Sequence, residues 1–143
     1  MIETMHANHG VGLAANQVGV PLRIAVIQGP DDINPLILIN PEIVKREGRR
    51  ELTEGCLSIP GYQGDVGRSV MVKVKAINID GRSFRIKAED SLLAQALEHE
   101  TDHLDGKLYV ERLLAKDTIY KIERDEINGE EDCDQDATST ESR

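Results

Sequence analysis

The feature that most constrains this chain is the HExxH sequence at residues 99–103. On a helix, residues four apart lie on the same side about one turn from each other, so His99 and His103 can both reach one divalent cation. A water bound to such a cation becomes more acidic, and the neighbouring Glu100 can accept its proton and later deliver one to a leaving amine. The motif therefore predicts a metal-dependent amide hydrolase.

The helix that carries this motif is bounded by clear signals. Asp90 or Ser91 can cap its start, and Gly106 is a favoured residue just past a helix end, so we expect a helix to about Leu104. One stripe of this helix contains Leu92, Ala96, His99 and His103, an adjacent stripe contains Leu93, Leu97, Glu100 and Leu104, and the remaining side contains Gln95, Glu98, Asp102 and Asp105. The histidines and the motif glutamate should point inward with the leucines. Burying them is costly unless they are paired or coordinated, which favours a metal site over a chance pair of histidines.

The rest of the chain is typical of an α+β fold. Residues 23–28 and 36–40 are short β-branched runs bounded by Pro and Gly, and residues 70–79 and 83–88 alternate around the turn signal Asp80-Gly81. Residues 1–8 resemble the last turns of a helix, and residues 113–127 could form a final one. We expect mostly antiparallel sheets packed around a central HExxH helix, with a further C-terminal helix.

A length of 143 residues suits a single domain. We assign residues 1–128 to one catalytic domain. Residues 129–143 are acidic, contain Ser and Thr and are nearly free of apolar side chains, so we expect them to form a disordered tail.

Charge and composition exclude several classes of protein. The net charge of −9 disfavours a phosphate-binding surface, so direct binding to nucleic acid is not expected. No apolar run approaches the roughly 20 residues that span a bilayer, and no signal peptide is recognisable, which indicates a cytoplasmic protein that does not bind membranes. Its two cysteines, Cys56 and Cys133, do not form a disulfide framework, so Cys56 is free to bind a metal.

A catalytic metal of this kind usually has a third protein ligand, and two candidates remain open from the residues alone. Cys56, which follows the flexible Gly55 between two strand-like segments, could bind as a thiolate, although a buried structural cysteine is equally expected. One protease route would place a histidine at position 109, but Tyr109 stands there; the carboxylate of Glu123 could replace it. The choice of the third ligand separates two classes of metal-dependent hydrolase, and Glu123 as that ligand would give an HExxH metalloprotease.

Three segments together resemble the motifs of the peptide deformylase family. They are Gly10–Gln17 (GVGLAANQ), Glu54–Ser58 (EGCLS) and His99–His103 (HETDH), in that order. The similarity extends from Met1 to about Leu114 and leaves out the acidic tail. The family normally has further residues ahead of the point where this chain begins, so we expect part of the usual N-terminal region to be absent.

The resemblance implies a metal site and a substrate. Cys56, His99 and His103 would bind one divalent metal, Fe²⁺ in the family's native state, with Zn²⁺, Ni²⁺ or Co²⁺ as substitutes. Glu100 would act as general base and then acid. The enzyme would remove the formyl group from the N-terminal formyl-methionine of nascent polypeptides.

The resemblance also implies where that substrate is held. The Gln17 side-chain amide and the Leu57 backbone N–H would stabilise the oxyanion of the transition state. The residues implied for binding the methionine and the extended peptide are Val11, Gly12, Gly55, Leu92 and Ala96. We expect a monomer with at most transient ribosome association.

Some positions depart from the family pattern. Glu98 stands where Gln is common, Gln95 where Arg or an aliphatic residue is usual, and Ser91 where Gly is usual. A third reading, beside the deformylase and the metalloprotease, is a non-catalytic truncated relative that binds formyl-methionine peptides without turnover.

Overall fold

Two antiparallel sheets and one long helix make up the part of the chain that the computed structural model describes, residues 1–122. The five-stranded sheet has the order β1 (Gly12–Ala14), β2 (Ile24–Ile27), β3 (Leu36–Glu47), β6 (Met71–Ile77), β7 (Ser83–Glu89). The three-stranded sheet has the order β4 (Arg50–Cys56), β5 (Ile59–Arg68), β8 (Ile119–Lys121). The helices are α1 (Ile2–Ala7) and α2 (Leu92–Leu104), with short 3-10 helices η1 (Ala15–Val18), η2 (Tyr109–Arg112) and η3 (Lys116–Thr118). The predicted α+β class with antiparallel sheets is confirmed.

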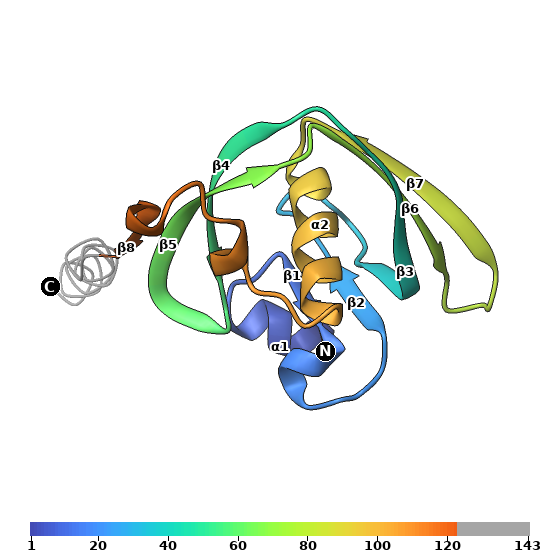
Figure 1. Ribbon diagram of the computed structural model, residues 1–143. Coiled ribbons are helices and arrows are strands. Elements are labelled where there is room, and N and C mark those ends of the chain that lie inside the picture. Colours follow the sequence, from blue (N-terminus) through green and yellow to red (C-terminus); the bar gives the residue numbers. More distant parts are fainter. Residues whose placement is uncertain (123–143) are drawn as a thin grey trace, which may run out of the picture.

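Helix α2 lies between the two sheets in Figure 1. Its ends match the sequence signals, because the Ser91 hydroxyl accepts a hydrogen bond from the Ala94 N–H at 3.2 Å and Gly106 adopts φ +78° after the last turn. Within residues 1–122, no helix is long and apolar enough to cross a membrane.

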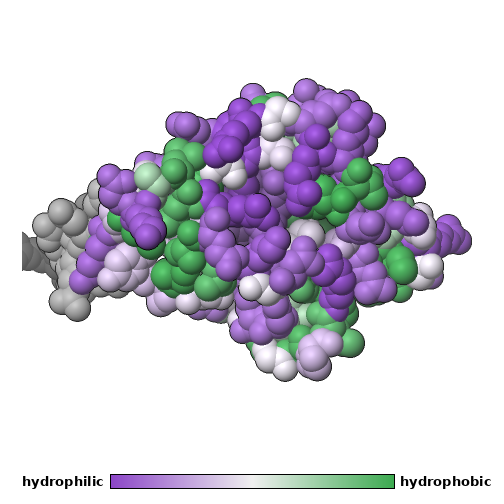
Figure 2. Space-filling view, in the orientation of Figure 1, coloured by the Kyte–Doolittle hydropathy of each residue, from purple (hydrophilic) through white to green (hydrophobic). Residues whose placement is uncertain are grey.

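The apolar core lies between α2 and the five-stranded sheet. Its fully buried members are Ala25, Ile27, Leu38, Val72, Val74, Ala76, Ala88, Ala94, Ala96 and Leu97. Several of these are alanines, which let the helix backbone approach the sheet closely. The space-filling view shows that polar side chains cover most of one outer face, with apolar groups gathered over part of the three-stranded sheet (Figure 2).

The β6–β7 hairpin follows the predicted turn. Gly81 adopts φ +82°, and the Asn78 side chain accepts the N–H groups of Asp80 and Arg82 at 3.0 and 2.9 Å. A residue with a Cβ would be strained at that φ, which explains the glycine.

Three side chains of α2 differ in exposure from what the helix pattern predicted. Glu98 and Asp102 were expected on the polar side of α2, yet they are only 7% and 4% exposed. Arg68 and Arg112 contact Asp102, and the Ser69 N–H and Arg46 contact Glu98, which no periodicity on the helix could reveal. Leu92, expected to point inward, is 44% exposed.

Two segment boundaries also differ. Strand β3 continues through Pro41 to Glu47, because the pairing with β6 shifts register between Ile39 and Glu42 and so does not need the missing proline N–H. From Leu113 to Ile122 the chain contains η3 and β8 rather than the start of a long helix, because β8 pairs with β5 at Tyr62–Gly64. Glu123 and the predicted tail at 129–143 lie outside the described residues.

Candidate metal centre

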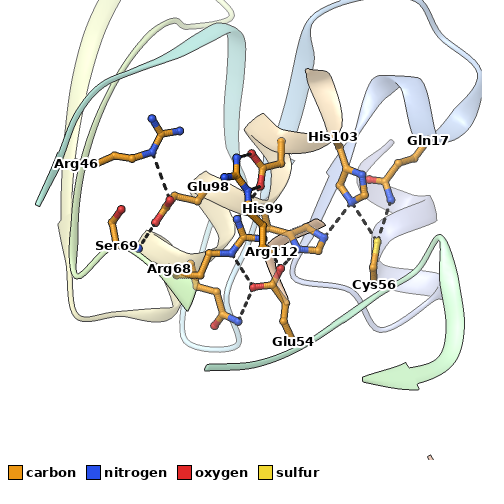
Figure 3. A network of polar contacts seen from close by, with 12 residues as sticks. Gln17, Arg46, Glu54, Cys56, Arg68, Ser69, Glu98, His99, His103 and Arg112 are labelled. Carbon is orange, nitrogen blue, oxygen red and sulfur yellow. Dashed lines mark hydrogen bonds and ion pairs between the residues drawn. The ribbon is translucent and has the colours of Figure 1, made fainter. Parts of the chain in front are cut away.

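The three predicted ligands meet at one point of the structure. Cys56 ends β4, while His99 and His103 lie one turn apart on α2, and their ligand atoms are all within 4.8 Å of one another. Cys56 Sγ is 3.1 Å from His103 Nε2, which is 2.9 Å from His99 Nε2 (Figure 3). Residues more than forty positions apart are thereby brought to one cluster of one sulfur and two nitrogens.

The donor set fits a transition-metal ion. The carboxylate of Glu54 contacts His99 Nδ1, so with a cation bound that nitrogen would keep the ring proton and Nε2 would present its lone pair to the ion. Burial raises the pKa of Cys56, but hydrogen bonds with His103 and His99 outweigh this and lower it to about 5. A thiolate and two imidazole nitrogens are ligands that zinc, iron and similar ions accept.

Glu100 lies beside this cluster without belonging to it. It is only 4% exposed, and its Oε2 has no hydrogen-bond partner among the described residues. Burial raises the pKa of Glu100 to about 7, so its carboxyl can both take and give a proton near neutrality. A Cβ on Gly12 would come within 2.5 Å of Glu100 Oε1, so only glycine leaves room for this carboxylate.

Gln17 is fixed with its amide nitrogen toward the cluster. Its Oε1 accepts the Ala14 N–H at 2.8 Å, and its Nε2 donates to Ser58 Oγ at 2.9 Å and lies 3.8 Å from Cys56 Sγ. Leu57, between the cysteine and that serine, is 38% exposed.

A cavity of about 710 Å³ opens beside the cluster. The residues implied for substrate and oxyanion binding all line it: Val11, Gly12, Gln17, Gly55, Leu57, Leu92 and Ala96. His99 and Glu100 line it as well, so all of these predicted site residues face one space.

A buried ion network lies beside the cluster and contacts His99 through Glu54. Glu54 accepts from Arg68 Nε at 3.0 Å and Nη2 at 2.5 Å, Arg68 Nη1 donates to Asp102 at 2.7 Å, and Arg112 donates to Asp102 at 2.9 and 3.1 Å (Figure 3). Burial alone would raise the pKa of Glu54, but hydrogen bonds from His99 and Arg68 lower it to about 2. Glu54 is therefore ionised and would hold the ring proton of His99 on Nδ1 when a cation is bound.

Sequence reasoning did not find this network. Glu54 and Arg68 lie on neighbouring strands of the second sheet, and their pairing across β4 and β5 could have been suspected only from a known strand register. The single available signal was an arginine at the end of an otherwise uncharged stretch, Val66–Ser69.

Comparisons with known proteins agree on one family. The family model described as Polypeptide deformylase matches residues 1–118. A peptide deformylase of Dehalococcoides mccartyi (strain CBDB1) is 51% identical over 131 residues, covering 92% of this chain and 78% of that protein, and one of Thermomicrobium roseum is 48% identical over 131 residues, covering 87% and 74%.

Solved structures give the same result. A peptide deformylase of Legionella pneumophila is similar with a TM-score of 0.75 and 47% identity, covering 79% of this chain and 67% of that one. The Synechococcus elongatus peptide deformylase in complex with actinonin gives a TM-score of 0.77 and 43% identity, covering 81% and 63%.

Proposed function

Because the chain belongs to the polypeptide deformylase family, and is thereby a hydrolase of that class, we propose that it removes the formyl group from the N-terminal formyl-methionine of nascent polypeptides. The products are formate and a free amino terminus. The observation that carries this proposal is the Cys56, His99 and His103 cluster with the buried Glu100 beside it in one cavity.

Cys56, His99 and His103 would hold one divalent ion. We propose Fe²⁺, with Zn²⁺, Ni²⁺ or Co²⁺ as substitutes, because one thiolate and two imidazoles suit all of these ions. When bound, the ion supplies Lewis acidity and makes a coordinated water acidic enough to lose a proton near neutral pH.

Glu100 moves the protons of the reaction. With a pKa near 7, its carboxylate accepts a proton from the attacking water and the resulting acid donates one to the departing amine. Its Oε2, which has no hydrogen-bond partner within residues 1–122, can take part in this exchange.

Gln17 and Leu57 stabilise the negative charge that develops on the formyl oxygen. The Ala14 N–H holds the Gln17 carbonyl, so the amide Nε2 is oriented before substrate arrives, and the Leu57 backbone N–H is the second donor. Donors that are already oriented need no rearrangement in the transition state.

The walls of the cavity position the substrate. Val11, Leu92 and Ala96 supply apolar surface for the methionine side chain. On its outer side β1 has no partner strand among the described residues, so the extended peptide can pair there through Gly12, with Gly55 opposite.

We place this activity in the cytoplasm, carried out by a monomer on chains leaving the ribosome. The net charge of −9 supports a transient association without direct binding to nucleic acid.

The test is formate release from a formyl-methionine peptide by iron-loaded, oxygen-protected protein. Glu100→Ala should lower kcat/KM at least about 100-fold, the usual contribution of a general base, while keeping the metal. Glu111→Ala, which removes an exposed carboxylate on η2, is the matched control and should leave the rate unchanged. Cys56→Ala should lose the metal.

Three outcomes would contradict parts of this proposal. Metal retained in Cys56→Ala would reject the cysteine as a ligand. Internal peptide cleavage that depends on Glu123 would favour a protease, and tight binding of the formyl peptide without any turnover would indicate a non-catalytic relative.

A further inference from the structure

The carboxylate of Glu54 has a complete set of hydrogen-bond donors. Oε1 contacts His99 Nδ1 and Arg68 Nη2, while Oε2 accepts from Arg68 Nε at 3.0 Å and from Gln95 Nε2 at 3.1 Å. An ionised carboxylate offers about four lone-pair sites, so all of them are used. Each donor therefore helps to fix the rotation of this group.

Gln95 differs from the other two donors in where it lies. Arg68 is buried in the ion network, and His99 belongs to the metal cluster, whereas Gln95 belongs to neither; it is half-buried and, like His99, lines the main cavity. It is placed one turn before His99 on α2, so both side chains reach Glu54 from the same face of the helix.

We infer that Gln95 is a positioning residue that acts on His99 through Glu54. This inference rests on the proposed function, since it takes His99 as a metal ligand. The Gln95 amide holds Oε2 and thereby keeps Oε1 against His99 Nδ1, which fixes the ring with Nε2 toward the cation.

The alternative role for this residue is a simple wall of the cavity. A wall residue would change how tightly the substrate binds and would not change how firmly the cation is held. The two roles therefore predict different effects on KM and on metal release.

The decisive measurement is the rate at which Co²⁺-loaded protein releases its ion to a chelator, together with the visible absorption of the bound Co²⁺. Gln95→Met keeps the length of the side chain and removes its donor. It should accelerate release about three- to tenfold, below the 10- to 100-fold usual for a direct partner of a ligand. It should also lower kcat more than it raises KM.

Two charged variants sharpen this test. Gln95→Glu places a second carboxylate against Glu54 and should accelerate release more than Gln95→Met. Gln95→Arg restores a donor and should release at nearly the wild-type rate. Both are good helix formers, so they remain comparable if Gln95→Met folds poorly.

Gln63 provides the matched control. It lines the same cavity from β5, and among the described residues its side chain makes no hydrogen bond to Glu54. Gln63→Met should leave metal release unchanged.

Equal release rates for wild type, Gln95→Met and Gln95→Glu, or for Gln95→Glu and Gln95→Arg, would overturn the inference. Because release is measured without substrate, a protein that holds Co²⁺ but hydrolyses no formyl peptide would reject the proposed function alone. A wild-type chain that binds no ion would reject both.

Discussion

The two sides of helix α2 are held by different physical forces. Toward the five-stranded sheet, Ala94, Ala96 and Leu97 pack against aliphatic side chains. Toward the three-stranded sheet, Asp102 and His99 join the charged side chains of Arg68 and Glu54.

The apolar side fixes the position of α2, whereas the charged side orients His99, a predicted metal ligand on that helix. Apolar packing has no strong direction, so it fixes the distance of α2 from the sheet and tolerates changes that conserve volume. Hydrogen bonds between buried charges depend on angle as well as distance, so the charged side sets the orientation of His99. Each side should therefore respond to mutation in its own way.

The largest expected effect comes from the charged side. Arg68→Met removes the shared partner of Glu54 and Asp102 and leaves two buried carboxylates short of donors, which should cost about 3–5 kcal/mol of unfolding free energy. Urea unfolding measures this loss of unfolding free energy. Lys45→Met, which breaks the exposed pair with Glu47, should change the unfolding free energy far less. If the two variants lost similar amounts of unfolding free energy, burial would not explain how much the ion network contributes to stability.

The apolar side should give the next largest effect. Leu97 is fully buried, and Leu97→Ala should cost about 3 kcal/mol through lost burial and a residual cavity. Leu97→Met conserves volume and should cost less than about 1.5 kcal/mol. In both variants the visible absorption of bound Co²⁺ should keep its wild-type shape. An altered spectrum would show that apolar packing also orients the metal ligands.

The smallest expected effect is a change in how strongly the stability of the fold depends on pH in acid. The pKa of Glu54 in the folded chain is about 2, below its ordinary 4.5, so the unfolded chain binds this proton first as the pH falls. In metal-free protein its contribution to stability should be complete above pH 4.5 and disappear as the pH falls toward 2. Thermal unfolding across this range should show a weaker pH dependence in Glu54→Gln. Leu97→Ala should keep the wild-type slope.

The sequence predicted what local signals control. The caps at Ser91 and Gly106, the turn at Gly81 and the spacing of His99 and His103 each act within a few residues, and the structure has all of them. The inward direction of Glu100 followed from the same helix pattern.

Features that depend on the three-stranded sheet could not be predicted from the sequence. Asp102 was assigned to the solvent side of α2 because periodicity describes one helix and not what covers it. The strand β8 forms at residues 119–121 because β5 offers it a free edge. The pairing of Glu54 with Arg68 likewise needs the register of β4 and β5.

The shortness of β1 has a consequence for turnover. This edge strand has only three residues, Gly12–Ala14, so a peptide that pairs with it gains few main-chain hydrogen bonds. A long edge would hold the deformylated product almost as well as the substrate, and product release would then limit the rate. If the substrate pairs with β1 as proposed, three residues would give the peptide its direction and register and would let it leave after a single cleavage.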